Sequence, residues 1–276
     1  MPELPEVETI RRGLSKILIG RTISGVQVRQ SKLRWPVDAG KLSALATGQP
    51  ITSVKRRAKY LLLELGNQAN LVFHLGMSGR LLVFTKKRPP EKHDHVLFYF
   101  NDGAELCFND PRRFGMVDVI LPAELDTYPR FRNLGVEPLD ENVDPEQIFG
   151  QISASKRSVK AVLMDAAVIA GVGNIYANEA LFYAGIHPAC AMNQLSLQQW
   201  RTLFSCVRDV LQQAVAMGGT TLNDFLDSSG NPGYFQQTLA VYGREDLPCP
   251  RCHQPIRRIV QTGRSSFFCS HCQSCP

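Results

Sequence analysis

The order of apolar and polar residues divides the chain into a β-rich N-terminal part and a helical C-terminal part. Near the start, apolar residues recur at helical spacing, and Gly20 follows them as a stop signal. These apolar positions are Val7, Ile10, Leu14, Ile17 and Leu18. The pattern predicts that the N-terminus leads directly into an amphipathic helix.

Short apolar runs separated by turns follow, from Ile23 to about Leu121. They are ISGVQV, YLLLEL, NLVFHL, RLLVF, VLFYF, ELCF and MVDVIL. Turn signals such as Asn101-Asp102-Gly103 separate the runs, and no helical pattern lies between them. This succession predicts an antiparallel β-sandwich or barrel, and we assign residues 1–130 to this N-terminal domain.

Residues 131–150 are rich in Pro, Asp and Glu and show no sustained period, which is typical of a linker. Beyond them, SKRSVKAVLMDAAVI and IYANEALFYAG are helical in composition, and GVGN joins them as a tight glycine turn. A longer helix is expected from Ser196, where Gln199 completes a capping box, to Gly218-Gly219. Residues 151–240 therefore form a predicted helical domain, and the fold class is α+β.

The cysteines fall into two groups. Cys107, Cys190 and Cys206 lie singly in apolar stretches and are expected to be small buried hydrophobes, whereas five others lie in the last 28 residues. Among these, the Cys-x-x-Cys pairs at Cys249 and Cys269 have the spacing of a zinc hairpin, which we assign to residues 241–276. The predicted ligands are Cys249, Cys252, Cys269 and Cys272. Four thiolates leave no open coordination position, so one structural zinc ion is expected and Cys275 is superfluous.

The net charge of +6 suits a polyanionic partner, although many basic proteins bind no nucleic acid. No run of apolar residues reaches the length of a membrane span. The N-terminus carries glutamates instead of a basic segment followed by an apolar run. We therefore expect a cytoplasmic protein with no membrane partner.

Two polar regions suit DNA. The glycine turn ending at Asn174 exposes backbone amides and a helix N-terminus to a phosphate, although such a turn is often only a connector. Lys156, Arg157 and Lys160 lead into that turn and favour the phosphate interpretation. In the N-terminal domain, Met77, Arg113 and Phe114 suit a protein that flips a nucleotide, because it must fill the vacated stack with wedges.

Several motifs are specific to one family. They are PELPEVE from Pro2, HLGMSGR from His74, KHDHV from Lys92, NDPRRFG from Asn109, GVGNIYANEAL from Gly171, GGTTLNDF from Gly218, VYGR from Val241 and the finger with Gly263-Arg264. Along nearly its whole length the chain resembles the formamidopyrimidine-DNA glycosylases. The resemblance implies a helix plus β-sandwich, a helix-two-turn-helix domain and a zinc finger.

The resemblance also implies the reaction and its residues. A glycosylase of this kind excises oxidised purines such as 8-oxoguanine and formamidopyrimidines from damaged duplex DNA, working as a monomer, and cuts the strand by β,δ-elimination. Pro2 is implied to form the Schiff base, while Glu3 donates a proton at the sugar and Glu6 supports it. Lys59 is implied to act in β-elimination and Arg264 in δ-elimination.

The remaining implied residues contact DNA. Those at DNA-binding positions are His74, His93, Arg112, Lys156, Lys160, Asn174 and Tyr242. Met77, Arg113 and Phe114 fill the void, and Thr220 and Thr221 begin the loop that caps the lesion. Asn223 and Asp224 follow in that loop, where relatives vary, so the preferred base is less firmly implied than the reaction.

Two other functions are possible on this evidence. An endonuclease VIII-like enzyme would share the layout but prefer oxidised pyrimidines, and NDPRRFG and the capping loop argue against it. A non-catalytic, zinc-stabilised DNA-binding protein would account for the basic charge and the finger. It would have no use for Pro2 followed by Glu3 and Glu6, although the two glutamates alone are also ordinary favourable charges at a helix N-terminus.

Overall fold

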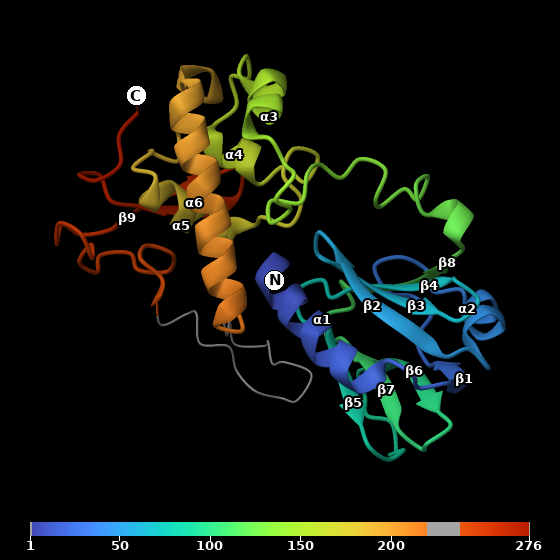
Figure 1. Ribbon diagram of the computed structural model, residues 1–276. Coiled ribbons are helices and arrows are strands. Elements are labelled where there is room, and N and C mark those ends of the chain that lie inside the picture. The colour runs from blue at the N-terminus through green and yellow to red at the C-terminus, as the bar shows by residue number, and fades with distance from the viewer. Residues whose placement is uncertain (1, 220–237, 276) are drawn as a thin grey trace. The chain divides into compact units, whose positions relative to one another are not determined.

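The computed structural model describes residues 2–219 and 238–275, shown in Figure 1. The chain forms two compact units, and the first comprises residues 1–132 with 217–234. The second comprises residues 133–216 with 235–276. Thr220 and Thr221, predicted to cap the lesion, lie outside the described residues together with Asn223 and Asp224.

Two helices belong to the N-terminal unit. Helix α1, Leu4–Leu18, is the predicted amphipathic helix, and its buried face includes Val7, Ile10 and Leu14. Gly20, at a φ of +88°, follows it in the left-handed region that glycine tolerates. Helix α2, Ala39–Ala46, was not predicted; its N-cap is Asp38, whose carboxylate accepts the backbone N–H of Lys41.

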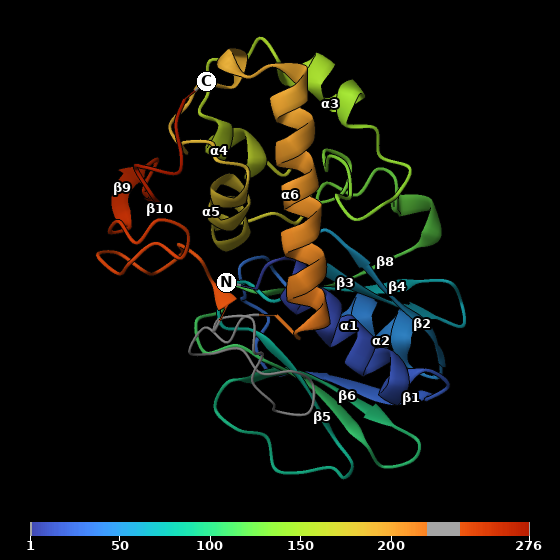
Figure 2. The ribbon, with the colours of Figure 1, turned by 60° about the vertical axis from the view of Figure 1, so that its left-hand side comes forward.

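Two four-stranded antiparallel sheets make up the predicted sandwich. Figure 2 shows this part of the chain with helices α1 and α2. One has the order β1-β6-β7-β5, with β1 Ile23–Val28, β6 Asp94–Phe100, β7 Glu105–Asn109 and β5 Arg80–Phe84. The other has the order β2-β3-β4-β8, with β2 Ile51–Arg57, β3 Tyr60–Leu65, β4 Asn70–His74 and β8 Met116–Ile120. Phe73 contacts Phe98 and Phe108 across the sandwich, at ring-centroid distances of 5.8 and 6.3 Å. A 3₁₀ turn, Pro122–Glu124, follows β8.

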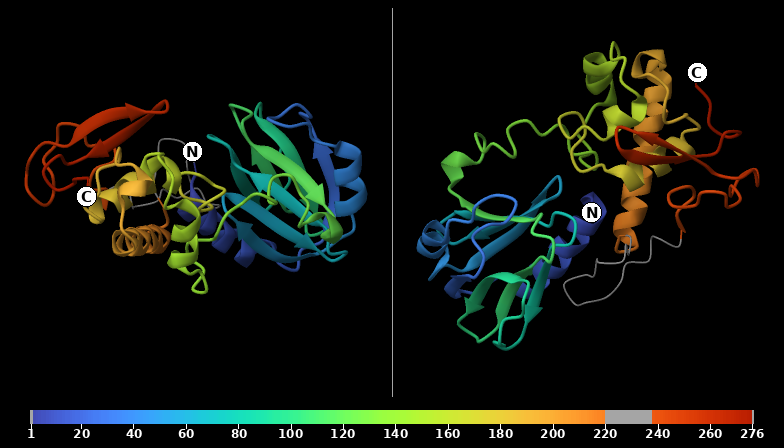
Figure 3. Two further views of the ribbon diagram at one scale, coloured as in Figure 1. Left: turned by 90° about the horizontal axis from the view of Figure 1, so that it is seen from above. Right: turned by 180° about the vertical axis from the view of Figure 1, so that it is seen from behind.

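Helices and a hairpin make up the C-terminal unit (Figure 3). They are α3 Pro145–Ile152, α4 Val159–Leu163, α5 Asn174–Tyr183, a 3₁₀ turn Met192–Gln194, α6 Leu197–Ala216, β9 Arg257–Gln261 and β10 Arg264–Phe268. The capping box before α6 is confirmed, because Ser196 and Gln199 each accept the other's backbone N–H. Helix α5 is buried along most of its length and packs against α6 and β10.

Two predictions about local structure were wrong. Helix α3 begins at Pro145, inside the predicted linker, because Asp144 caps it and Ile148 and Ile152 give it a buried face. The helix expected over 155–169 is only the short α4. After α4, the carboxylate of Asp165 accepts the backbone N–H of Ala167, and Val136 pairs with Ile169 as a parallel β-bridge. These contacts replace further helical hydrogen bonds.

The prediction for Cys190 needs correction. Cys190 is buried as expected, but it forms a disulfide with Cys275, which had been taken for a superfluous thiol. The backbones also pair, because His187 N–H donates to Ser274 O at 3.0 Å and Ser274 N–H donates to Gly185 O at 3.1 Å. The C-terminal tail is thus fastened to the loop after α5. Cys107 is fully buried, as predicted.

None of the helices in residues 2–219 and 238–275 is both long enough and apolar enough to cross a membrane.

Candidate active site and DNA interface

The start of α1 carries the predicted nucleophile and acids. Pro2 is buried, and Glu3 and Glu6 are only 3% and 2% exposed. The backbone N–H of Glu3 donates to Glu6 Oε2 at 2.8 Å, so Glu6 fixes the first turn of the helix. A Cβ atom at Gly219 would lie 3.0 Å from Glu6 Oε1, so the backbone of Gly219, directly before Thr220, passes close to this carboxyl.

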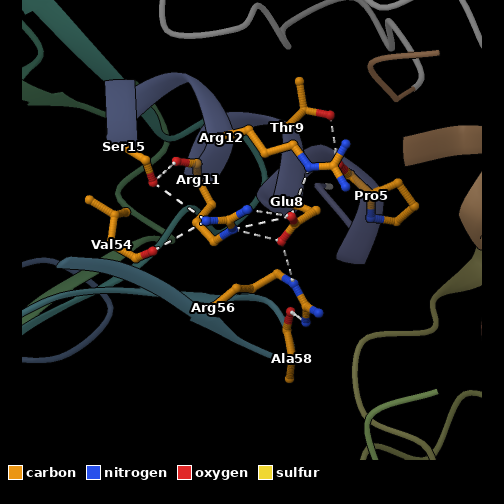
Figure 4. A network of polar contacts seen from close by, with 9 residues as sticks. All are labelled: Pro5, Glu8, Thr9, Arg11, Arg12, Ser15, Val54, Arg56 and Ala58. Carbon is orange, nitrogen blue, oxygen red and sulfur yellow. Dashed lines mark hydrogen bonds and ion pairs between the residues drawn. The ribbon is translucent and has the colours of Figure 1, made fainter. Parts of the chain in front are cut away.

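Glu8 fastens α1 to the sheet, a role that the sequence did not reveal. Figure 4 shows its carboxylate accepting hydrogen bonds from Arg11, Arg12 and Arg56. Burial alone would raise the pKa of Glu8, but the hydrogen bonds from Arg11 and Arg12 and the charge of Arg56 outweigh it and lower that pKa. Arg56 also donates to Ala58 O at 3.0 Å. The network therefore links the helix that begins beside Pro2 with the turn that contains Lys59.

Lys59 lies in the two-residue turn between β2 and β3, where Ala58 has a φ of +52°. Its charge reaches His74, at the end of the neighbouring strand β4. Burial first, and then the charges of Lys59 and Arg34, lower the pKa of His74 to about 4. Gly76 N–H donates to His74 Nδ1 at 3.0 Å, so the proton of the neutral ring lies on Nε2. His74 can therefore donate to a phosphate without carrying charge.

The predicted wedge residues occupy two loops of the N-terminal unit. Met77 is 42% exposed and Phe114 43%, so both apolar side chains lie at the surface. Arg113 is exposed and has a φ of +57°, a strained value for a residue with a Cβ. The Arg112 guanidinium lies 4.8 Å from the centre of the Phe114 ring. His93 lies just before β6, and its backbone carbonyl accepts a hydrogen bond from the backbone N–H of Asp110.

In the C-terminal unit, two predicted phosphate ligands dock the hairpin onto the helices. Lys160 Nζ donates to Ser265 O at 2.8 Å and to Ser266 Oγ at 2.7 Å, and its side chain is buried. Asn174 Nδ2 donates to the same Ser265 carbonyl at 3.1 Å. Lys160 therefore helps to hold the hairpin, and a DNA contact by Lys160 stays a prediction. Lys156 is exposed.

A buried carboxyl of the C-terminal unit, Glu179 of α5, holds the turn that carries Tyr242. It accepts the backbone N–H groups of Ala240, Val241 and Tyr242 at 2.7 to 3.0 Å. Burial raises the pKa of Glu179 although these three hydrogen bonds act in the opposite direction. The sequence contained Glu179 within a recognised motif but gave no sign of this contact, which spans more than sixty residues.

Arg264 follows the tip of the hairpin. Thr262 and Gly263, at φ values of +47° and +74°, form the two-residue turn before it, as expected for a tight hairpin. Arg264 lines a cavity of about 460 Å³ together with Arg157, Ser158, Lys160, Ala161, Met164, Gln261 and Thr262. Arg157 pairs with Asp165 at 2.7 Å, whereas the side chain of Arg264 is exposed. The cavity is thus a basic site that suits an anion.

The four predicted cysteines meet as a metal site. Their Sγ atoms all lie within 4.8 Å of one another, with Cys249 3.9 Å from Cys272 and Cys252 3.4 Å from Cys269. A tetrahedral zinc with bonds of about 2.3 Å places its sulfurs about 3.8 Å apart, so the donors fit this ion. Without a cation, burial and the neighbouring sulfurs raise the pKa of Cys272 to about 12. The cluster is the site of one structural zinc ion.

Three family descriptions match consecutive parts of the chain. Residues 1–117 match the formamidopyrimidine-DNA glycosylase N-terminal domain, and residues 134–226 match the H2TH domain of the same glycosylases. Residues 246–274 match a zinc finger found in FPG and IleRS. The chain is 48% identical to the formamidopyrimidine-DNA glycosylase of Alkalilimnicola ehrlichii, with 99% of this chain and 100% of that protein covered. It is 47% identical to that of Laribacter hongkongensis, with the same coverage.

Solved structures agree with the sequence relatives. The Lactococcus lactis Fpg in complex with abasic-site DNA superposes with a TM-score of 0.91 at 34% identity, covering 99% of both chains. The MutM (Fpg) protein of Thermus thermophilus superposes with a TM-score of 0.88 at 40% identity, covering 99% of this chain and 98% of that one. The chain therefore belongs to the formamidopyrimidine-DNA glycosylase family.

Proposed function

We propose that this chain excises oxidised purines, including 8-oxoguanine and formamidopyrimidines, from duplex DNA and then cuts the strand at the same nucleotide. Family membership makes it a DNA glycosylase and lyase of base-excision repair. The observation that carries the proposal is the start of α1, where Pro2 precedes two buried carboxyls. A Lactococcus lactis relative has been solved with DNA containing Fapy-dG.

Pro2 can act only after Met1 has been removed, because its amine is otherwise part of a peptide bond. An α-amino group has a pKa of about 8, against about 10.4 for lysine, so far more of it is neutral at pH 7. Its lone pair would attack the sugar C1′ as the bond from C1′ to the base breaks. A secondary amine then gives a cationic iminium, which acidifies the 2′ protons and opens the way to elimination.

The other catalytic roles follow from family position and local geometry. Glu3 would give a proton to the sugar ring oxygen as the ring opens, and Glu6, bonded to the Glu3 backbone, would hold it in place. Lys59 would donate a proton during β-elimination, which releases the 3′ phosphate. Arg264 would bind the 5′ phosphate that leaves in δ-elimination.

DNA would be held mainly through its phosphates, by a single protein chain working in the cytoplasm. Lys156 and Arg264 are exposed cations, while His74 and Asn174 offer neutral N–H donors. Met77, Arg113 and Phe114 would occupy the gap left by the flipped nucleotide. Thr220 and Thr221, which lie outside the described residues, would contact the lesion.

The test is reductive trapping with borohydride, which converts the iminium into a stable protein–DNA bond. We expect trapping on a duplex with 8-oxoguanine when Pro2 is N-terminal, and none when Met1 is retained, with lesion binding largely preserved. Pro2→Gly should still trap, more slowly, because its primary amine also forms a Schiff base. Trapping with the amine blocked would rule out Pro2 as the nucleophile.

One observation favours testing a second substrate class. A Lactococcus lactis relative has also been solved with DNA containing an oxidised pyrimidine. The same trapping assay should therefore include a duplex with an oxidised pyrimidine. We expect faster trapping on the purine lesion, and the reverse ranking would favour an endonuclease VIII-like specificity.

A further inference from the structure

Asp110, a residue of NDPRRFG with no role assigned so far, connects the two loops that carry the exposed wedges. Its carboxyl is completely buried. Ser78 Oγ donates to Asp110 Oδ1 at 2.6 Å, and Gly115 N–H donates to Asp110 Oδ2 at 2.8 Å. Arg112 N–H lies 3.3 Å from both Ser78 Oγ and Asp110 Oδ1. We call Ser78, Asp110 and the backbone N–H groups of Arg112 and Gly115 the Asp110 network.

Strand β6 and the residue before it hold Asp110 itself in place. Asp110 N–H donates to His93 O at 3.0 Å, and the Asp110 carbonyl lies 2.7 Å from Nε2 of the buried His95. Because a carbonyl only accepts, the proton of His95 lies on Nε2. The carboxyl therefore projects from a fixed point on the sandwich.

The two loops also touch along their backbones. A Cβ atom at Gly76 would lie 2.4 Å from the carbonyl carbon of Phe114, and Gly76 has a φ of +62°, so only glycine fits there. Gly115 is equally confined, since its Cβ would lie 2.8 Å from His74 O. The loop with Met77 and the loop with Phe114 therefore form one packed layer, and the Asp110 network joins them.

We propose that Asp110 and Ser78 are positioning residues that make Met77, Arg113 and Phe114 a single rigid wedge. Ser78 follows Met77 directly, and the hydrogen bonds to Arg112 N–H and Gly115 N–H bracket Arg113 and Phe114. The bracket holds Arg113 at its φ of +57°, a conformation that persists only where its surroundings fix it. The inference rests on the proposed function, in which these side chains enter the DNA stack.

A rigid wedge has a physical advantage. Opening a base stack costs a few kcal/mol, and separately mobile side chains would lose conformational entropy at the same step. Buried hydrogen bonds to a carboxylate are short and strong, so the backbone that carries the three side chains is ordered before DNA binds. The effect of substituting one wedge residue on excision should therefore depend on whether the other wedge residues are intact.

The test combines Ser78→Ala with a double-mutant cycle of Met77→Ala and Phe114→Ala, measured by single-turnover excision of 8-oxoguanine. In the otherwise unchanged protein, we expect the two substitutions to be non-additive by about fivefold or more. With Ser78→Ala in the background, the same pair should be additive within about twofold. Ser78→Ala alone should slow excision by about tenfold and leave affinity for lesion-free DNA within about twofold.

Two further variants separate positioning from general stability. Ser78→Thr retains the hydroxyl and should restore most of the excision rate. Ser53→Ala is the matched control, because Ser53 Oγ also donates to a carboxylate, Glu64 Oε2, at 2.6 Å in the same unit. It should leave both the excision rate and the wedge coupling unchanged.

Other results would overturn the inference. If Ser78→Ala leaves excision and coupling intact, or lowers the melting temperature while coupling persists, Asp110 and Ser78 serve only the fold. If Met77→Ala and Phe114→Ala each excise at the normal rate while the protein still forms the borohydride-trapped complex, the wedge itself is wrong and the glycosylase chemistry stands. If the unchanged protein forms no trapped complex, the proposed function fails instead.

Discussion

The surroundings of His74 keep it neutral at physiological pH. Burial and the nearby charges of Lys59 and Arg34 lower its pKa to about 4, and Gly76 occupies Nδ1. An exposed histidine at the same position would be partly protonated near pH 6.5. In the proposed DNA contact, the neutral ring would give a phosphate one N–H donor and release no counterion, so its contribution to binding would be insensitive to salt.

This neutrality predicts how stability depends on pH. Between about pH 6.5 and pH 4 the unfolded chain binds a proton at His74 that the folded chain does not bind. The neutral His74 contributes fully to the free energy of unfolding above about pH 6.5. This contribution decreases as the pH is lowered, by on the order of 2 to 3 kcal/mol at pH 4. In His74→Gln, the free energy of unfolding measured with urea should therefore depend less on pH across this range.

His253→Asn is a suitable control, because His253 is exposed and Asn also tolerates its φ of +61°. The free energy of unfolding of this variant should depend on pH as it does in the unchanged protein. Equal slopes for His74→Gln and the unchanged protein would mean that His74 titrates normally in the fold.

At the scale of single residues, the sequence predicted side chains for the chemistry but did not predict the side chains that would position them. Pro2 and Glu3 lie in the motif PELPEVE. The carboxyls of Glu8 and Asp110 act on partners 48 and 32 residues away in the chain. Such a partner is set by tertiary packing, so neither periodicity nor charge pattern marks these residues.

At the scale of elements, the link from Glu8 to Arg56 fixes α1 against β2. Both side chains are little exposed, at 13% and 11%. Glu8→Gln leaves several arginine donors without a charged acceptor and should cost about 1.5 to 3 kcal/mol in free energy of unfolding. Because Pro2 lies just before α1, excision should also slow. Both effects are measured by chemical denaturation and single-turnover kinetics.

Glu64→Gln is the matched control for Glu8→Gln. Glu64 pairs with Lys55 at 2.7 Å on the hairpin that also contains Arg56, but the Lys55 side chain is 62% exposed. Glu64→Gln should lower the free energy of unfolding by less than about 1 kcal/mol and leave excision unchanged. Similar costs for the two variants would show that Glu8 is only another surface charge.

The finger provides a prediction about metal removal. Cys249→Ser should release the zinc ion, because a structural site needs all four thiolates. Arg264 would then lose its fixed position, and affinity should fall for lesion-bearing and lesion-free DNA alike. Metal analysis and binding assays measure the two effects. Cys206→Ser, at a half-buried cysteine of α6, is the control and should retain zinc.

The disulfide limits how far the finger can come apart. Cys190–Cys275 and the pairing of Ser274 fasten the tail independently of the metal. After loss of zinc, the amide of Ser274 should therefore stay protected from hydrogen exchange while those near Cys249 do not. Loss of protection at Ser274 as well would mean that the metal alone holds the tail.

Elements were predictable where the pattern is local. The strands with full apolar runs, such as Tyr60–Leu65 and Arg80–Phe84, have the predicted bounds. Helix α2 escaped prediction because it is short and buries only Leu42 and Ala46. The helix expected over 155–169 is cut short by the pairing of Val136 with Ile169 and by the close approach of Gly135 to Val168. Contacts between distant segments override helix propensity there.

At the scale of the whole molecule, holding DNA and reading the lesion are assigned to different residues. Lys156 and Arg264 belong to the C-terminal unit and would contact phosphates, which carry no base information. Met77, Arg113 and Phe114 belong to the N-terminal unit and would enter the stack only when a nucleotide has left it. The two sets should therefore fail in different ways.

Arg264→Ala should weaken binding of damaged and undamaged duplexes alike and reduce the log–log salt slope by about one unit, because one counterion-releasing contact is lost. Phe114→Ala should slow single-turnover excision while lesion-free affinity and its salt slope stay nearly unchanged, since the ring carries no charge and meets DNA only at the opened stack. Binding of both variants to both duplexes across a salt series, beside single-turnover excision, measures the difference. If Phe114→Ala loses lesion-free binding as severely as Arg264→Ala, the loop around Phe114 is part of the phosphate contact surface and not a wedge.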